Sequence, residues 1–294
     1  MKELFAVFVK GKWIILSITI FISMLGVVYS LSLPNIYKSE ALVVSSTPTN
    51  NSNIIRNYAG LANISGISLP PQSNESNSSQ AFEKIKSLSF FESNFMPNIF
   101  LPDLMAYDSW NSSLNKSIYN DSIYDSQNNS WVHKTLRKQS EPSSQRSFNV
   151  FIAKHLEIYT DKDTNFINIS VAHKNPYIAQ EWNKILIDQI NYYYRGKDRK
   201  EAEAASDYLS NILLETKLFE VKQVIAALLQ KETQKLTLIE SNEFYVYEII
   251  DPPAVMETKS GPNRALICIL IFIFGFALSS SIVLAKYYIF SERK

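Results

Sequence analysis

Two long apolar segments lie near the ends of the chain, with a largely polar region between them. The segments cover residues 14–33 and 265–285, and neither contains a charged residue. A helix of about 20 residues spans the roughly 30 Å hydrocarbon core of a bilayer. We therefore predict two transmembrane helices. The alternatives are a cleaved signal peptide for the first segment and a buried core helix for the second.

Positive charges flank both segments on the sides nearest the chain ends. They are Lys2, Lys10 and Lys12 before the first segment, and Lys286, Arg293 and Lys294 after the second. Cytoplasmic flanks of membrane proteins carry such an excess of Lys and Arg. We expect cytoplasmic tails at 1–13 and 286–294 and a periplasmic domain over 34–264.

Within 34–264, β-forming residues predict strands at about 36–44, 148–159, 165–173 and 244–250. Asp161 to Asp163 would form the turn of a hairpin, so the base strands cover 36–44, 148–173 and 244–250. A short helix is predicted from residue 80 to 96. The fold class is α+β, with a small mixed sheet at the membrane-proximal base.

A long helical region is predicted over about 177–240, opened by Asn175 as N-cap and Pro176 at the first position. Its apolar stripe slips by one residue near Thr216. In one continuous helix the slip would rotate the stripe. In a helical hairpin it would mark the turn, with Thr216 capping the returning helix. The need to bring the chain back to the membrane favours the hairpin, and both forms stay open.

Two other stretches are rich in Asn and Ser. Residues 45–80 are expected to be loop, and residues 108–147 are expected to be irregular with short helices.

Composition excludes several classes of function. The net charge is +1, and no basic stretch is interleaved with aromatic residues, so nucleic acid is not an expected partner. The only cysteine, Cys268, lies in the second apolar segment, so the periplasmic domain has no intrachain disulfide. Its stability must come from packing and assembly.

The sequence contains no phosphate-binding loop, zinc-binding His-Glu-x-x-His or Gly-x-Ser-x-Gly motif. His155 and His173 would be neighbours across the predicted hairpin, while His133 lies elsewhere. Two histidines without an acidic or cysteine partner are a poor metal site. Asp161 and Asp163 are typical turn residues. We expect no enzyme, no cofactor and no metal.

Several short motifs occur in a characteristic order between the two apolar segments. They are Pro34 to Ala41 (PNIYKSEA), the strand Asn165–His173, Asn-Pro followed by Ala179, Trp182 and Asn183, Asn191 to Arg195 (NYYYR), Asp251-Pro252-Pro253, Lys259 to Arg264 (KSGPNR), and Gly275. In this order they resemble the chain-length determinant family, the Wzz-type polysaccharide co-polymerases of bacterial inner membranes. Residues 45–147 resemble nothing in that family.

The resemblance implies a ring-like homo-oligomer that catalyses nothing. With a Wzy-type polymerase, it would set the modal length of O-antigen in lipopolysaccharide or of a related surface glycan. Further partners would be the lipid bilayer and the growing lipid-linked glycan. The alternatives are a two-span periplasmic sensor or receptor subunit and a regulator of capsule or exopolysaccharide export.

By the same resemblance, a few residues would form a rigid link and a packing contact that couple the ring to the membrane. The candidates are Pro252, Pro253, Pro262, Arg264 and Gly275. The chain departs from the family by having fewer prolines before the second span and by having Ser279 where a second glycine is common. A small residue at 279 still allows close helix approach.

Overall fold

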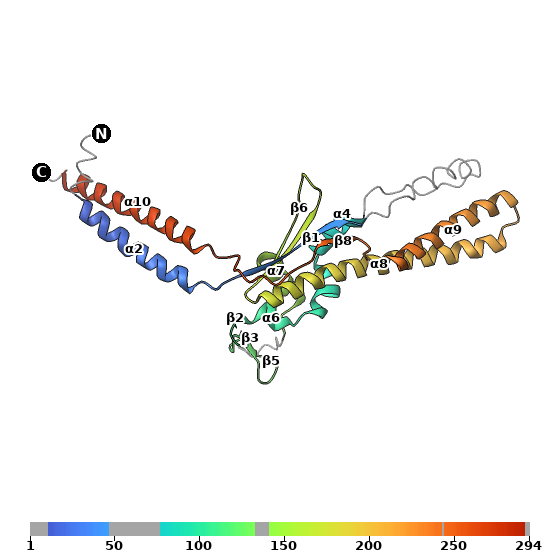
Figure 1. Cartoon of the computed structure of the whole chain (residues 1–294), viewed down its shortest axis with the longest axis horizontal. Helices are drawn as coiled ribbons and strands as arrows, with labels where there is room; N and C mark the ends of the chain where they lie inside the picture. The colour runs from blue at the N-terminus through green and yellow to red at the C-terminus, as the bar shows by residue number, and fades with distance from the viewer. Residues whose placement is uncertain (1–10, 47–76, 133–140, 243, 292–294) are drawn as a thin grey trace. The chain divides into compact units, whose positions relative to one another are not determined.

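The structure is a computed structural model of the chain, and it describes residues 11–46, 77–132, 141–242 and 244–291. The chain divides into two compact units. One contains residues 1–37 and 257–294, and the other contains residues 38–256. Figure 1 shows the elements of both units. The flanking residues Lys2, Lys10, Arg293 and Lys294, as well as His133 and residues 47–76 of the expected loop, lie outside the described residues.

The first unit consists of two helices, α2 (Lys12–Ser32) and α10 (Arg264–Ser291). Both are long and apolar enough to cross a membrane. They run side by side and pack against each other (Figure 1). Few of their residues are buried. In the most apolar 18-residue stretch of each helix, 22% is buried for α2 and 17% for α10. A buried core helix of a soluble domain would have most of its surface covered, so this exposure favours a surface that faces lipid.

The second unit is built on a four-stranded sheet with the order β6-β7-β1-β8. The strands are β1 (Tyr37–Ser45), β6 (Leu156–Thr160), β7 (Ile167–His173) and β8 (Tyr247–Asp251). β6 pairs antiparallel with β7, and β1 pairs antiparallel with β8. Strands predicted from three distant parts of the sequence therefore meet in one sheet, and the α+β class is confirmed.

The turn between β6 and β7 is held by the side chain of Asp161. Its Oδ1 accepts hydrogen bonds from the backbone N–H groups of Asp163 (2.8 Å) and Thr164 (3.2 Å). Asn165 closes the turn with a φ of 58°, a left-handed conformation that Asn tolerates. Asp161 and Asp163 thus have the structural role in a turn that their sequence indicated.

The prediction that the first hairpin strand begins at Phe148 is wrong, because residues up to Lys154 form a helix. Helix α7 (Ser144–Lys154) starts after Ser143, whose hydroxyl accepts from the N–H of Arg146 as an N-cap. The apolar residues of this stretch alternate like a strand, but the fully buried positions are Ser147 and Phe151, one helical turn apart. The strand begins only at Leu156.

The core lies between one face of the sheet and the helices. Trp182, Leu186 and Ile190, on the first part of helix α8 (Pro176–Glu215), are buried together with Val43 and Ile169 of the sheet. The helical elements described between β1 and β2 are short: α4 (Asn77–Ile85), α5 (Leu88–Phe90), the π-helix η1 (Phe91–Phe95), the 3-10 helix η2 (Met96–Asn98) and α6 (Leu101–Met105). The predicted helix from 80 to 96 is thus present as consecutive short pieces.

The short helices expected over residues 108–147 are absent from 108–132; there the structure has two small hairpins. They pair β2 (Tyr107–Asn111) with β3 (Lys116–Tyr119), and β4 (Tyr124–Asp125) with β5 (Ser130–Trp131). Asn115 and Asn129 adopt positive φ angles of 45° and 48° in the two turns. Asn favours such turns because it tolerates the left-handed conformation.

The long helical region is a hairpin of two helices, α8 and α9 (Phe219–Ser241), which lie side by side (Figure 1). α8 continues through Gly196. The turn falls at residues 216–218, where the apolar stripe slips. Thr216, however, is the C-cap of α8, and its hydroxyl donates to the carbonyl of Ile212 (2.7 Å). The N-cap of α9 is Leu218, so the predicted capping of the returning helix by Thr216 is wrong.

Candidate membrane-coupling site

The five candidate residues are divided between the two units of the chain. Pro252 and Pro253 belong to the unit of residues 38–256, whereas Pro262, Arg264 and Gly275 belong to the unit that holds the two apolar helices. The structure therefore shows two separate local arrangements, which are described in turn.

Pro252 and Pro253 follow directly after β8. Proline has no N–H to donate to a neighbouring strand, so the pair ends the strand ladder. Pro253 is buried, and its carbonyl accepts a hydrogen bond from Nε2 of Gln180 on α8 (3.3 Å). The next carbonyl, that of Ala254, accepts from the hydroxyl of Ser39 on β1 (2.9 Å). The segment after β8 is thus fastened to both a helix and a strand of its own unit.

In the unit with the two apolar helices, the segment that follows α2 and the segment that precedes α10 are held together by backbone hydrogen bonds. The N–H of Ile36 donates to the carbonyl of Gly261 (2.9 Å), and the N–H of Ser260 donates to the carbonyl of Ile36 (2.8 Å). Pro262 follows at once and is half-buried. It lies two residues before the start of α10, a position where its missing N–H costs no helical hydrogen bond.

Arg264 connects the start of α10 to the end of α2. One guanidinium nitrogen, Nη2, donates to the backbone carbonyl of Leu33 and to Oδ1 of Asn35, both at 3.1 Å. Asn263 accepts from the N–H of Leu266 (3.2 Å) and so satisfies one of the free N–H groups in the first turn of α10. The sequence marked Arg264 as a coupling candidate by resemblance but indicated no partner for it; the structure places its partners just after the end of α2.

Gly275 lies where α10 approaches α2 closely. A β-carbon at this position would lie 3.1 Å from Cγ2 of Ile22. On α2, Gly26 lies against Ile271 in the same way, with a distance of 2.6 Å. Small residues allow helix backbones to come close in a membrane, where van der Waals packing stabilises association. The coupling role of Gly275 stays a prediction.

Ser279, which replaces the second glycine of the family pattern, also lies in the contact between the helices. It is fully buried, and its hydroxyl oxygen is 3.1 Å from that of Thr19 on α2. The same hydroxyl donates to the carbonyl of Phe276 (2.9 Å). Such a contact gives the two hydroxyl groups hydrogen-bond partners that lipid tails could not supply.

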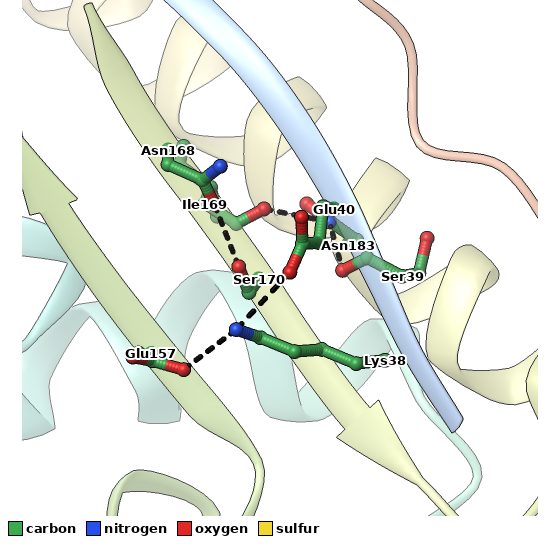
Figure 2. Close-up of polar contacts among 8 residues, drawn as sticks. All are labelled: Lys38, Ser39, Glu40, Glu157, Asn168, Ile169, Ser170 and Asn183. Carbon is green, nitrogen blue, oxygen red and sulfur yellow. Dashed lines mark hydrogen bonds and ion pairs between the residues drawn. The ribbon is translucent and has the colours of Figure 1, made fainter. Parts of the chain in front are cut away.

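A buried amide joins the helix layer to the sheet in the unit of residues 38–256. Nδ2 of Asn183 on α8 donates to the carbonyls of Ser39 on β1 and Ile169 on β7, both at 2.9 Å (Figure 2). Asn183 is fully buried. The sequence marked this residue only as part of a motif. Its isolated polarity among apolar helix positions was the signal that it bonds to the sheet.

An ion-pair cluster lies on the side of the sheet away from α8. Nζ of Lys38 on β1 lies 2.8 Å from Oε2 of Glu157 on β6 and 3.1 Å from Oε1 of Glu40 (Figure 2). Its side chain reaches across Ser170 of the intervening strand β7. Burial alone would lower the pKa of Lys38, but the hydrogen bonds and charges of Glu157 and Glu40 outweigh it and the pKa is raised.

His155 and His173 are neighbours, as predicted, with ring centroids 5.6 Å apart. Nδ1 of His155 is 2.7 Å from the carbonyl of Ala172, so it must donate. Nδ1 of His173 accepts from the N–H of Asn175 (3.0 Å), and its Nε2 is 3.2 Å from the carbonyl of Asp103. Neutral imidazoles satisfy all of these hydrogen bonds.

Burial lowers the pKa of His155 to about 4 and that of His173 to about 3, in the second case with help from the charge of its neighbour. Burial also raises the pKa of the nearby Asp103 to about 6, against the effect of the Tyr119 hydroxyl that donates to it (2.7 Å). In the part of the chain that the structure describes, no three His, Cys, Asp or Glu side chains are placed to hold a metal ion. The histidine pair is part of the core.

Comparison with known families gives one match. Residues 1–95 match the family model of the Wzz chain length determinant protein. Over these residues the chain is similar to the chain length determinants. This match confirms the resemblance in the sequence. It contains α2, β1 and the first short helices up to Phe95, so the expectation that residues 45–147 resemble nothing in that family is wrong for residues 45–95. Pro252, Pro253, Pro262, Arg264 and Gly275 lie outside it. The search of curated proteins found no match.

Solved structures with similar chains include polysaccharide co-polymerases. A full-length bacterial polysaccharide co-polymerase is 12% identical, with a TM-score of 0.42, and the match covers 99% of this chain and 98% of that one. A fragment of the polysaccharide co-polymerase WzzB from Salmonella Typhimurium is 13% identical, with a TM-score of 0.30 and coverage of 77% and 100%. A mutant of a Shigella flexneri lipopolysaccharide O-antigen chain-length regulator is 13% identical, with a TM-score of 0.23 and coverage of 76% and 100%.

Proposed function

We propose that this protein regulates the chain length of a surface polysaccharide, such as the O-antigen of lipopolysaccharide or a related glycan. The observation that carries the proposal is the match of residues 1–95 to the chain length determinant family. The matched segment contains both the first apolar helix and the opening strand of the sheet. In this role the protein catalyses nothing and acts with a Wzy-type polymerase and its growing lipid-linked glycan.

The proposed location is the bacterial inner membrane, with α2 and α10 as the spans. Both chain ends would be cytoplasmic and residues 34–264 periplasmic, as the positive flanking residues favour. The length and exposed apolar surface of the two helices support this arrangement.

We also propose that the protein assembles into a ring-like homo-oligomer. Support comes from the turn of the α8–α9 hairpin, where large apolar side chains are exposed: Leu214 at 83%, Leu218 at 65% and Phe219 at 68%. Exposed apolar groups gathered in one place are typical of interaction surfaces. In a ring, neighbouring copies would cover parts of this surface.

The coupling role of the candidate residues is part of the same proposal. Pro252 and Pro253 would give a rigid exit from the sheet, and Pro262, Arg264 and Gly275 would hold the second span against the first. Movements of the assembled domains would then pass to the bilayer through fixed connections.

The experiment that tests the function is deletion of the gene followed by electrophoresis of the surface glycans. Deletion should change a ladder with a modal length into a random length distribution, and the wild-type gene on a plasmid should restore the mode. An unchanged ladder for every surface glycan would contradict the proposal. A clean monomer under several mild detergent conditions would contradict the ring.

A further inference from the structure

One face of the four-stranded sheet carries exposed side chains and lies on the side away from α8, as far as the described residues show. Alternate residues of β1, namely Ser39, Ala41 and Val43, are buried on the side of α8. The residues between them face the other way, as the ion pair of Lys38 with Glu157 shows (Figure 2). We call this second side the open face.

The open face carries mostly negative charge. Its charged residues are Glu40 on β1, Glu157 on β6, Glu248 and Asp251 on β8, and Lys38 on β1. The pairs Val44–Glu248 and Leu42–Asp251 place the two β8 carboxylates on this side, because directly paired residues point to the same face. The side chains of Glu40 and Glu157 are 44% and 62% exposed.

The open face also carries apolar side chains between its charges. Ile250 on β8 is 49% exposed, and Tyr159 on β6 is 47% exposed, while Leu42 and Val44 on β1 are half-buried. Apolar positions within a charged rim are the composition expected of a contact surface.

Helix α7 presents the opposite charge. Its exposed side carries Arg146 and Lys154, and the helix contains no Asp or Glu. Together with Asn149 and Val150 these residues line a groove of about 370 Å³. This side, which we call the α7 face, points away from the core, since Ser147 and Phe151 are the fully buried residues of the helix.

The two faces lie on opposite sides of the same sheet. Phe151 of α7 packs 6.1 Å from Trp182 of α8, measured between ring centroids, so α7 belongs to the helix layer that covers the buried face. The open face is on the other side. Two surfaces on opposite sides of a domain cannot meet within one chain, but they can meet between successive copies.

We infer that the α7 face of one copy docks on the open face of the next copy, and that this contact joins the copies of the proposed oligomer. The inference rests on the proposed function only for the expectation that the protein assembles. A helix laid on a sheet face is a common layer arrangement. Complementary charge sets the orientation, and a head-to-tail contact of this kind generates a ring when its rotation closes.

Charge reversal in full-length protein tests the contact. Two double variants are compared in mild detergent: Arg146→Glu with Lys154→Glu, and Glu248→Lys with Asp251→Lys. Each should lower the fraction of protein that is oligomeric at least tenfold. All four changes in one chain should restore most of it. Lys116→Glu, an exposed reversal on β3, is the matched control and should change nothing. Thermal melting of each variant separates misfolding from loss of contact.

Cysteine cross-linking in intact membranes tests the same contact without changing charge. In a Cys268→Ser background, Asn149→Cys and Tyr159→Cys in one chain should give a ladder of cross-linked copies. Each cysteine alone should give none, because a head-to-tail contact does not bring identical residues together. Asn149→Cys with Lys116→Cys is the control pair and should also give none.

The inference is overturned if the protein is oligomeric but the Asn149–Tyr159 pair does not cross-link, or if the fourfold charge exchange does not restore assembly. These results are separate from the glycan ladder. A wild-type gene that restores modal length, without the predicted cross-links, contradicts only the contact. If the predicted cross-links form but deletion of the gene leaves glycan length unchanged, only the proposed function is contradicted.

Discussion

Gly275 on α10 and Ile22 on α2 lie so close that a β-carbon added to the glycine would be 3.1 Å from Cγ2 of the isoleucine. This distance is tighter than an ordinary van der Waals contact. The two helices therefore meet at a point where even a methyl group would require Ile22 to move slightly. On the same side of α10, one turn further along, Ser279 meets Thr19.

Gly275→Leu should separate the two helices. Overpacking a close contact costs about 1–3 kcal/mol, so the ratio of tightly packed to separated pairs should fall by roughly fivefold or more. The measurement is disulfide formation between Thr19→Cys and Ser279→Cys in a Cys268→Ser background. Ala277→Leu, at an exposed position of the same helix, is the control and should leave disulfide formation unchanged. Equal cross-linking in both variants would show that Gly275 is not needed for packing.

Arg264→Ala should loosen the joint between the end of α2 and the start of α10. Loss of the two guanidinium hydrogen bonds at a partly exposed site should cost about 1 kcal/mol, or roughly fivefold in local opening. Hydrogen exchange of the Ile36 amide, which is bonded to Gly261, should speed up by that factor. Lys259→Ala is the control. Exchange that does not change in Arg264→Ala would mean that the backbone bridge holds without the arginine.

Asn183→Ala should destabilise the unit of residues 38–256. The change leaves the carbonyls of Ser39 and Ile169 without their buried amide donor, at a cost of about 1–3 kcal/mol. A lower midpoint in urea denaturation of the full chain is expected. Asn211→Ala, an exposed position on α8, should have little effect. Similar midpoints for both variants would contradict the proposed role of the amide.

Acid should destabilise the same unit through His155 and His173. Both pKa values are lowered in the folded state, so the unfolded chain binds more protons at mildly acidic pH. Their contribution to stability is present above about pH 6.5 and is lost as the pH falls toward about 4 and about 3. The raised pKa of Asp103, about 6, acts in the opposite direction over part of this range. Because two histidines destabilise the folded state on acidification and one carboxyl offsets part of their effect, the free energy of unfolding should fall by about 1.4 kcal/mol per pH unit between pH 6 and pH 4.

The measurement is the free energy of unfolding of the full chain between pH 7 and pH 4.5. His155→Asn removes one titrating ring and keeps a neutral donor for the carbonyl of Ala172. Its stability should therefore fall less steeply with acid than that of the wild type. Parallel curves for the two proteins would show that His155 does not couple folding to pH.

Much of the architecture was predictable because its signals are local or strongly periodic. The two uncharged apolar segments correspond to α2 and α10, and Asn175-Pro176 marks the start of α8. The slip in the apolar stripe at Thr216 marks the turn of the helical hairpin. In each case short-range chemistry and the final packing favour the same structure.

The errors come from places where local pattern and packing disagree. Phe148, Val150 and Ile152 alternate as in a strand, but burial of Phe151 against Trp182 stabilises a helix there. The hairpins of residues 107–131 depend on left-handed Asn residues and on cross-strand aromatic pairs, such as Tyr107 with Tyr119, that no short window of sequence contains.

The candidate site was predictable in its residues but not in its contacts. Arg264 was visible as a charge beside an apolar segment, yet its partners Leu33 and Asn35 lie 231 and 229 positions away in the chain. The same holds for Asn183 and Ser39, which are separated by 144 residues. Pairings over such distances depend on the whole fold.

The joint at Arg264 bears on how the two spans respond to membrane thickness. The candidate membrane spans within α2 and α10 have 21 and 23 residues, or roughly 32 and 35 Å of length. In a thinner bilayer, helices of this length tilt. Because Arg264 and the Ile36–Gly261 bridge join the two helices at one end, and Gly275 and Gly26 hold them together along their length, neither can tilt alone. With the helices as the proposed membrane spans, bilayer thickness would set a single angle for the pair, and the copies of the proposed oligomer in one membrane would share it.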